Sequence, residues 1–474
     1  MMSRSVKSII ALVVCAVLAA CAFTAFGFSK SFGAYANRSA NGKVIFFNFK
    51  PEGKDIWLYI ANEYKKDHPG VEIDVRTPQS HQYEDELSTA VNKAKGDPDA
   101  MPTLFQINGP VGYANWKDYT ADLTNSILYR SLSDKYKDYA VKDGNKVVGV
   151  PYVTENYGLI YNKALLARYA DLHNSKLAPE EDGKSFEDQI TSFTKLKEVA
   201  DDIQKRKDEL GVDGAFTSAG FDSSSDWRFK THLANIPLYY QFTEDKVESQ
   251  PASIKNSYVD NYRNIFDLYI SDSTTPVNQL STKTGEDAVY EFALGKAVFY
   301  QNGTWAWGDL SNAGMKAEDL GMLPIYIGAK GEETQGMATG SENYWCINDK
   351  ASPANKEATE AFLNWLLTSD AGKDALSKRL GFATPFNNFP EVKNPLVNAA
   401  TKYTAKHGKK PVKWEFVMMP SNGWKDDVGS SLLTYAQATK DGAQSNEANA
   451  EWEKVRTAFV DGWAKEYKIA HSKG

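Results

Sequence analysis

The sequence predicts an α/β protein built from two lobes, and three observations support this. The chain has 474 residues, which exceeds the roughly 250 to 300 residues at which a single hydrophobic core stops growing. Hydrophobic residues make up 42% and charged residues 24%, as is typical of a folded globular protein. After residue 42, strand-like apolar runs alternate with segments of helical periodicity, and this order favours mostly parallel sheets with crossover helices.

The first 41 residues are predicted to lie outside the folded body. Residues 1–20 contain basic residues followed by an apolar stretch, as in an export signal, and they end in a Leu-Ala-Ala-Cys sequence that resembles a bacterial lipobox. This predicts cleavage before Cys21, lipid modification of that cysteine, and a flexible tether over residues 21–41. Ordinary cleavage near Ala36 and an uncleaved anchor of about 20 apolar residues stay open as alternatives. All three possibilities place the body outside the cytoplasm.

The body is predicted to open with three strands separated by two helices. The strands are "KVIFFNF", "VEIDVRT" and "PTLFQING". In the first helix apolar residues recur at helical spacing from Ile56 to Tyr64, with a stop at residues 68–70, and the second helix covers about residues 83–95. In such sheets, ligands bind beyond the carboxyl ends of the strands. Asn48 at the end of the first strand, and Gln106 and Asn108 at the end of the third, are therefore candidate ligand-binding residues, with turn capping as the alternative role.

The second half of the chain is read more coarsely. Residues 186–210 form a lysine-rich helical stretch that we expect on a solvated face, and a change to small polar residues and aromatics follows it. Ser352 is a predicted N-cap with Pro353 at the first helical position of the next helix, on which Trp365 belongs to the apolar stripe. The last 60 residues read as helical.

One stretch, "GKAVFYQNGTWAWGDL" from Gly295 to Leu310, carries two tryptophans after a predicted strand. Asn302-Gly303 is a turn-forming pair, and on an extended segment Trp305 and Trp307 would point the same way. The two rings could be packed in the core, but tryptophan is also favoured where one side of the ring packs and the other meets a ligand. We expect Trp305 to face a cleft and Trp307 to pack beneath it.

Charge and residue usage exclude several classes of function. The formal charge is −7, from 54 basic and 61 acidic residues, and no Lys/Arg-rich stripe predicts binding of nucleic acid. Cys346 is the single cysteine of the body, so no internal disulfide is expected, and a small buried side chain is its predicted role. The six histidines are far apart, without ligand spacing, and are expected at the surface or at caps. We therefore expect no metal and no cofactor.

Three segments resemble a known family, the carbohydrate-binding extracellular solute-binding proteins of ABC importers, of the maltose-binding type. The segments are "VPYVTENYGLIYNKALL" (Val150–Leu166), the tryptophan stretch above, and "GSENYWCINDKASPANKEATEAFLNWLLTSDAG" (Gly340–Gly372). The resemblance implies a periplasmic-binding-protein fold, with two discontinuous lobes joined by crossover hinge segments. Lobe 1 would comprise residues 42–153 and 341–382, and lobe 2 residues 154–340 and 383–474.

The resemblance also implies a function and site residues. The protein would be a monomer that captures a sugar or oligosaccharide, closes on it, and delivers it to the permease of an ABC importer, without enzymatic activity. Trp305 falls on a tryptophan that stacks on the sugar, Glu155 on a carboxylate that accepts hydrogen bonds from its hydroxyls, and Asn48 on a polar contact. Weaker candidates, each with the hydrophobic core as the alternative, complete the predicted site: Trp227, Tyr344 and Trp424.

Two other functions stay open at this point. A glycoside hydrolase would need two carboxyl groups roughly 5 to 10 Å apart across the sugar bond, and a linear sequence can neither show nor exclude such a pair. The chain could also bind a solute other than a sugar. The family's maltose binder has an Asp-Arg pair where this chain reads Gly109-Pro110, so maltose is not the expected ligand.

Overall fold

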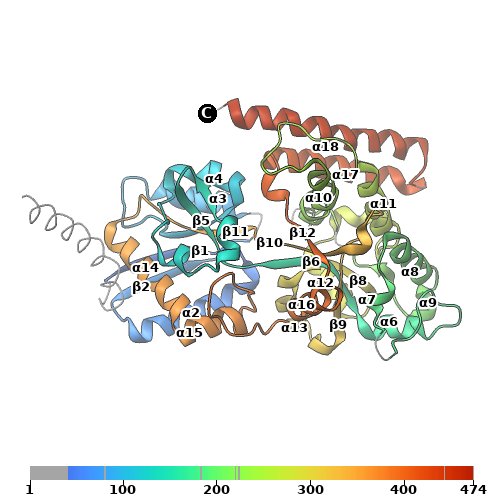
Figure 1. The fold of residues 1–474 in the computed structure, drawn as a ribbon, viewed down its shortest axis with the longest axis horizontal. Coiled ribbons are helices and arrows are strands. Elements are labelled where there is room, and N and C mark those ends of the chain that lie inside the picture. The colour runs from blue at the N-terminus through green and yellow to red at the C-terminus, as the bar shows by residue number, and fades with distance from the viewer. Residues whose placement is uncertain are drawn as a thin grey trace, which may run out of the picture.

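The computed structural model confirms the α/β class and shows two lobes side by side (Figure 1). The predicted export signal, the lipid attachment at Cys21 and all but the last residue of the tether lie outside the part of the chain that is described. No helix in that part is long and apolar enough to span a membrane. The residues that the structure describes are 41–79, 82–181, 184–218, 220–222, 225–441 and 443–472.

Lobe 1 is built on a sheet of six described strands in the order β2-β1-β3-β11-β5-β4. The predicted opening is confirmed, because β1 pairs in parallel with both β2 and β3. The strands are β1 (Gly42–Phe47), β2 (Val71–Arg76), β3 (Leu104–Asn108), β4 (Val141–Asp143), β5 (Lys146–Pro151) and β11 (Asn343–Ile347). The helices of this lobe are α2 (Lys54–Asp67), α3 (Tyr83–Lys93), α4 (Gly109–Trp116), α5 (Ile127–Ser131), α14 (Pro353–Thr368) and α15 (Asp370–Asp374).

Lobe 2 contains a second sheet of six described strands, in which β12, β10, β6, β8 and β7 follow one another and β9 pairs with β6. The strands are β6 (Glu155–Asn162), β7 (Gly214–Phe216), β8 (Ala297–Gly303), β9 (Leu320–Leu323), β10 (Gln335–Gly340) and β12 (Lys410–Lys413). Its helices are α6 (Lys163–Ala170), α7 (Phe186–Gln189), α8 (Phe193–Lys205), α9 (Lys207–Leu210), α10 (Asn235–Asp245), α11 (Val259–Ser271), α12 (Gly285–Ala293), α13 (Trp307–Asn312), α16 (Pro395–His407), α17 (Asn422–Ala438) and α18 (Asn446–Ser472).

Both sheets are mixed, which corrects the expectation of mostly parallel sheets. In lobe 1 the returning strand β11 is antiparallel to β3 and β5, and in lobe 2 the long strand β6 is antiparallel to β8, β9 and β10. The cause is the topology, because a chain that crosses to the other lobe and comes back enters each sheet from the opposite end.

The chain passes between the two sheets three times. The first connection joins β5 to β6 through residues 152–154, and the second joins β10 to β11 through residues 341–342. The third leads from lobe 1 to α16. The connections are tied to one another, because Thr154 N–H donates to the carbonyl of Ala383 at 2.7 Å and the Ser341 hydroxyl donates to the carbonyl of Val153 at 2.7 Å.

The third connection leaves lobe 1 later than the predicted boundary after residue 382. Phe386 and Phe389 still pack against the core of lobe 1, and the backbone of Asn387 donates to the carbonyl of Ser131 at 2.9 Å. The chain reaches lobe 2 only where α16 begins, so burial of these two aromatic rings extends lobe 1 along the chain.

Local sequence rules account for the helix that follows the last return to lobe 1. Ser352 caps α14 by accepting a hydrogen bond from Asn355 N–H, and Pro353 occupies the first helical position, as predicted. Ala358 and Phe362 are buried on its inner face, and Trp365 is partly buried against the same core.

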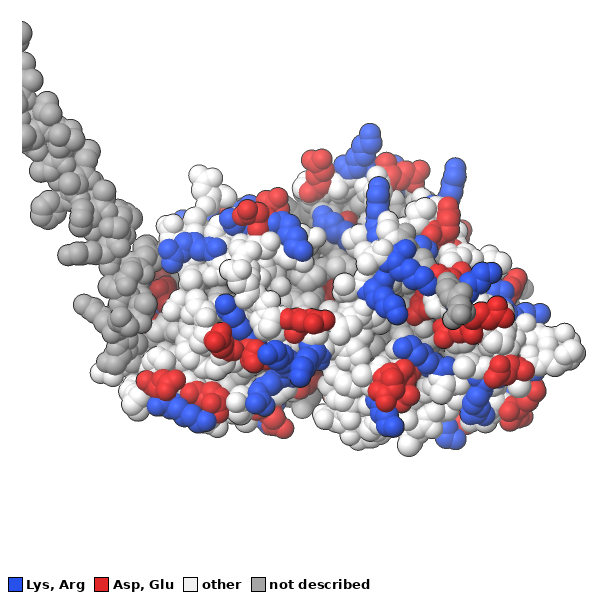
Figure 2. Space-filling model, turned by 60° about the horizontal axis from the view of Figure 1, so that its bottom comes forward, with Lys and Arg blue, Asp and Glu red and all other residues white. Residues whose placement is uncertain are grey.

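Lobe 2 ends in a helical hairpin. The helices α17 and α18 pack against each other along the top of the lobe in Figure 1, which confirms the predicted helical C-terminal region. When the molecule is turned so that the bottom of the Figure 1 view comes forward, acidic and basic side chains are seen interspersed over both lobes (Figure 2). Cys346 is buried in β11 and is not disulfide-bonded, in agreement with the role predicted for it.

Candidate functional site

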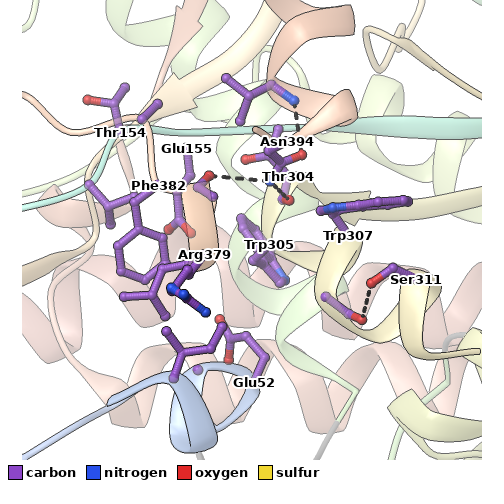
Figure 3. A pocket seen from close by; sticks show the side chains of 18 of the residues that line it. Glu52, Thr154, Glu155, Thr304, Trp305, Trp307, Ser311, Arg379, Phe382 and Asn394 are labelled. Atoms are coloured by element: carbon purple, nitrogen blue, oxygen red, sulfur yellow. Dashed lines mark hydrogen bonds between the residues drawn. The ribbon is translucent and has the colours of Figure 1, made fainter. Parts of the chain in front are cut away.

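A cavity of about 260 Å³ lies where the two lobes meet the hinge connections. Residues from both lobes and from the connections line this cavity. Lobe 1 contributes Glu52, Ile56 and Arg379, and the connections contribute residues 153–155 and 380–383. Lobe 2 contributes several residues between 304 and 312, and α16 forms one edge. Figure 3 shows Glu52 and Arg379 opposite Trp305 and Trp307. Carboxylate, guanidinium and indole groups therefore surround one space.

The tryptophan stretch folds differently from the prediction. Asn302 and Gly303 lie in strand β8, where they pair with β6, and the turn comes one residue later as a short 3-10 helix over Thr304–Ala306. Trp307 then opens α13. The prediction that residues 305–307 are extended is therefore wrong. Strand β8 continues through Gly303 in register with β6, so the chain turns only after Gly303.

Both tryptophan side chains are partly exposed, and both line the cavity. The expectation that Trp307 packs beneath Trp305 is wrong, since Trp307 packs against a separate group of core residues that includes Leu310. The Trp305 ring instead lies close against Gly303, where a Cβ atom would be 2.0 Å from the ring. A glycine at this position is what allows the ring to lie so close to the strand.

Trp305 belongs to an aromatic wall on lobe 2. Its ring is stacked on Tyr157 with a centroid distance of 5.8 Å, and it lies 5.5 Å from the His232 ring. The wall comes from four separate segments of the chain that sheet 2 and its helices bring together. Its members are Tyr157, Trp227, His232, Trp305, Trp414 and Phe416.

A buried ion pair faces this wall at the hinge. Lys50, which follows β1, donates to Glu155 at 2.7 Å and lies 3.7 Å from Glu52. Its ammonium group is also 5.5 Å from the centroid of the Trp305 ring, within the range of a cation–π contact. Burial lowers the pKa of Lys50, but Glu155 and Glu52 raise it by more, so the pKa is raised overall. Burial raises the pKa of Glu52, although Lys50 opposes the shift.

The carboxyl end of sheet 1 presents amide groups with unused hydrogen-bonding capacity. Gln106 Nε2, Asn108 Oδ1 and Asn343 Oδ1 are buried and have no hydrogen-bond partner among the described residues. On lobe 2, Trp414 Nε1 is also buried without a hydrogen-bond partner among the described residues. Buried polar groups in native proteins are nearly always paired, so this set of donors and acceptors marks the boundary between the lobes as a place where a polar ligand can bind.

The structure brings together most of the predicted site residues. Glu155 and Trp305 line the cavity, Trp227 is part of the aromatic wall, and Gln106 and Asn108 lie at the carboxyl end of β3 as expected. Tertiary contacts place all five at the boundary between the lobes, and their binding of a ligand stays a prediction. Gln106 also has the capping role that the sequence left open, because its Oε1 accepts a hydrogen bond from the backbone N–H of Phe49 after β1.

Three predicted site residues have other roles in the structure. Asn48 is buried and caps the turn after β1, because its side chain bonds the backbone N–H and carbonyl of Lys50. Tyr344 is buried in β11 and donates to the carbonyl of Ser341 at 3.0 Å. Trp424 is wholly buried, and its indole N–H donates to the carbonyl of Phe459. Trp424 is therefore a core residue, held by the hairpin of α17 and α18.

Sequence reasoning missed several residues of this region: Lys50, Glu52, His232, Arg379 and Trp414. The signal for Lys50 and Glu52 was present, since both follow the first strand at its carboxyl end. His232 contradicts the expectation of a surface or capping histidine, because it is buried within the aromatic wall. Burial, and then the charges of Lys425 and Arg228, hold the pKa of His232 well below 6.5.

Comparison with known proteins identifies the family. A family model described as bacterial extracellular solute-binding protein matches residues 59–405. The chain belongs to this family. Membership of the extracellular solute-binding proteins places the body outside the cytoplasm. Within the described residues, no group of three or more His, Cys, Asp or Glu side chains is arranged to hold a metal ion.

Individual solute-binding proteins resemble the chain in part or throughout. The melibiose/raffinose/stachyose-binding protein MelE of Bacillus subtilis (strain 168) is 26% identical over 172 residues, which span 36% of this chain and 34% of MelE. A structure of the solute-binding protein RafE in complex with raffinose has a TM-score of 0.65 at 18% identity and covers 90% of this chain and 99% of its own. The GacH receptor of Streptomyces glaucescens has a TM-score of 0.64 at 17% identity, over 90% and 99% of the two chains. The structural similarity shows that the fold is shared.

Proposed function

We propose that this solute-binding protein captures an oligosaccharide outside the cytoplasm and delivers it to the membrane permease of an ABC importer. One observation carries the proposal: the aromatic wall of lobe 2 and the polar carboxyl end of sheet 1 come together at the boundary between the lobes, where Trp305 of the wall also lines the cavity at the hinge. MelE and RafE, to which the chain is similar, are named for binding sugars of two to four rings.

The chemistry of the two surfaces matches a sugar. A pyranose ring has an apolar C–H face, which an aromatic ring covers, and a rim of hydroxyl groups that each donate and accept hydrogen bonds. Trp305 provides the aromatic surface. Glu155 is an acceptor and Lys50 a donor for hydroxyl groups at the hinge, while Gln106 Nε2 and Asn108 Oδ1, which have no partner among the described residues, provide a donor and an acceptor.

Hinge motion is the proposed means of capture. Three connections join the lobes, and such joints concentrate the change in backbone angles when domains close. The lobes are in contact in this structure, since a Cβ atom placed on Gly109 of lobe 1 would lie 3.4 Å from Val417 of lobe 2. We propose that the open form admits the sugar and that the closed monomer presents it to the permease, while a lipid on Cys21 holds the protein at the membrane.

The test combines binding and shape. Thermal melts against a panel of mono- and oligosaccharides identify ligands, because a ligand that binds only the folded state raises the melting temperature. Small-angle scattering should then show a smaller radius of gyration with the bound sugar. A protein that no sugar stabilises would contradict carbohydrate capture, and an unchanged radius with proven binding would contradict closure. Sugar turnover that Glu155→Gln abolishes would instead establish a glycoside hydrolase.

A further inference from the structure

Two buried charged side chains at the boundary between the lobes lack a contacting partner of opposite charge. Lys425 of lobe 2 lies near the start of α17 and is 8% exposed, and within the described part of the chain its ammonium group has no ion-pair or hydrogen-bond partner. Glu342 lies in the second connection, directly before β11 of lobe 1, and its side chain is 18% exposed. His232 Nε2, at 4.0 Å, is the one basic group that the described residues place within ion-pair distance of its carboxylate. The proposed function assigns no role to either charge.

Both charges lie beside His232 of the aromatic wall. After burial, Lys425 is the strongest of the influences that lower the pKa of His232, and Glu342 lies 4.0 Å from its ring nitrogen. The two groups also act on each other, because Glu342 raises the pKa of Lys425 more than any other charge does, against the larger effect of burial. The ammonium and the carboxylate are nevertheless not within ion-pair distance of each other. His232 does not supply the missing positive charge, because its low pKa keeps the ring neutral at neutral pH.

Burial costs each of these groups more free energy than its surroundings return. Burial lowers the pKa of Lys425, and the attraction of Glu342 does not offset it. Burial likewise raises the pKa of Glu342, although Lys425 and then Lys50 oppose the shift. Lys50 shows the opposite balance, because its ion pair with Glu155 at 2.7 Å helps to raise its pKa in spite of burial. A buried charge without a contacting partner destabilises the conformation that buries it.

The lobes meet close to both charges. Val417, in the short helix that precedes α17, would be 3.4 Å from a Cβ atom on Gly109 at the start of α4 in lobe 1. Glu342 is continuous with β11 and would move with lobe 1, whereas Lys425 belongs to lobe 2. Opening of the hinge would therefore separate the two charges and admit water to both, and closing would bury them again.

We propose that Lys425 and Glu342 form an electrostatic barrier that keeps the hinge open until a ligand binds. The barrier rests on the hinge motion of the proposed function. In the open form water solvates both charges, whereas the closed form buries them without a contacting partner, so closing is unfavourable while no sugar is bound. A sugar overcomes the barrier because its contacts favour the closed form. The permease would then meet closed protein only when the protein carries its sugar.

Sugar-free variants test the barrier, because their shape does not depend on any contact between these side chains and a ligand. Lys425→Met and Glu342→Gln each remove one buried charge, and the double variant removes both. Small-angle scattering should show a smaller radius of gyration for each single variant than for sugar-free wild-type protein. The double variant should reach the radius of the sugar-bound wild type, because a single variant still buries the other charge when it closes.

A lysine far from the boundary provides the matched control. Lys205 is exposed at the end of α8, a helix on the side of lobe 2 that is remote from lobe 1 (Figure 1). Lys205→Met should leave the radius of gyration unchanged. Thermal melts show that each variant is folded, and Glu342→Gln, which keeps the shape of the side chain, decides the question if the Lys425 variants do not fold.

The outcomes separate the barrier from the proposed function. If the folded variants keep the sugar-free radius of the wild type, while wild-type protein still becomes compact with its sugar, the barrier is refuted and the proposed function stands. A larger radius in a single variant also refutes the barrier, because the two charges would then hold the lobes together. Wild-type protein whose radius does not change with a sugar proven to bind contradicts hinge closure and the barrier together.

Discussion

Adding a single methyl group at Gly303 should displace Trp305, the tryptophan proposed to stack on the sugar, while leaving the strand intact. A Cβ atom at this position would lie 2.0, 2.2 and 2.4 Å from three carbons of the Trp305 ring. The backbone of Gly303 has φ −101° and ψ 178°, an extended conformation that alanine adopts without strain. The effect of Gly303→Ala therefore comes from the close approach of the ring and not from the backbone.

The expected magnitude follows from how far the ring must move. Ordinary contact begins at 3.4 Å, so the ring must shift by at least 3.4 − 2.0 = 1.4 Å. Overpacking of this kind costs about 1 to 3 kcal/mol of stability. The same shift removes the ring from the position at which it stacks on Tyr157 and meets the ligand, and the loss of one aromatic stacking contact predicts about 1 to 2 kcal/mol of weaker binding, roughly 5- to 30-fold in Kd.

Titration calorimetry with the sugar found by the ligand screen measures this loss directly. The matched control is Gly462→Ala on α18, where the new Cβ atom would sit in ordinary contact at 3.5 Å from Trp424 and where alanine favours the helix. A Gly303→Ala protein that binds with wild-type affinity would refute the reasoning, because the ring could then move without consequence or has no part in binding.

Three further predictions test the site, the aromatic wall and the hinge. Trp305→Ala should weaken sugar binding by about 2 to 3 kcal/mol, measured by calorimetry, whereas Trp424→Ala should leave binding unchanged and lower the free energy of unfolding by about 3 to 5 kcal/mol. Burial holds the pKa of His232 well below 6.5 in the folded protein, whereas the unfolded chain takes up a proton near pH 6.5, so wild-type stability relative to His232→Gln should fall by about 1 kcal/mol per pH unit below pH 6.5 and stay constant above it. Denaturant titrations from pH 7.5 to 4.5 check the sign. Asn394 caps α16 and donates to the carbonyls of Thr304 and Gly381. Asn394→Ala should therefore lower the free energy of unfolding by about 1 to 2 kcal/mol in urea titrations. Asn394→Asp keeps the oxygen that caps α16 but loses the amide that donates to the two carbonyls. A smaller loss in Asn394→Asp would show that the cap contributes more stability than these two hydrogen bonds.

Local patterns in the sequence were sufficient for much of the fold. The alternation of β1, α2, β2, α3 and β3 follows from apolar periodicity and stop signals that act within a few residues, and the start of α14 follows from Ser352 and Pro353. Such features depend on neighbours along the chain, so one sequence carries the information. The antiparallel partners of β6 and β11 depend on the return of the chain from the other lobe, which no local pattern encodes.

The candidate site was only partly predictable for the same reason. Glu155 and Trp305 lie within recognisable segments, but the wall around Trp305 draws His232 and Trp414 from segments whose partners are distant in sequence. Trp424 shows the opposite error. The sequence made it a weak site candidate with the hydrophobic core as the alternative, and the packing of α18 against α17 buries the ring completely. Burial in a helical hairpin depends on the second helix, and a tryptophan's own neighbours do not reveal it.

Thr304, the residue directly before Trp305, is hydrogen-bonded to the hinge, and this restricts how far the Trp305 ring can move relative to the hinge. Thr304, directly before Trp305, accepts a hydrogen bond from Asn156 N–H beside the first connection, and its carbonyl accepts one from Asn394 beside the third. In the proposed hinge motion the Trp305 ring therefore stays fixed relative to the hinge, whereas the polar edge of lobe 1 swings about it. A sugar that stacks on Trp305 in the open form would then meet Gln106 and Asn108 only on closure. Hydrogen bonds to that edge then contribute free energy to closing, because a ligand shifts an equilibrium only through contacts that differ between its two states.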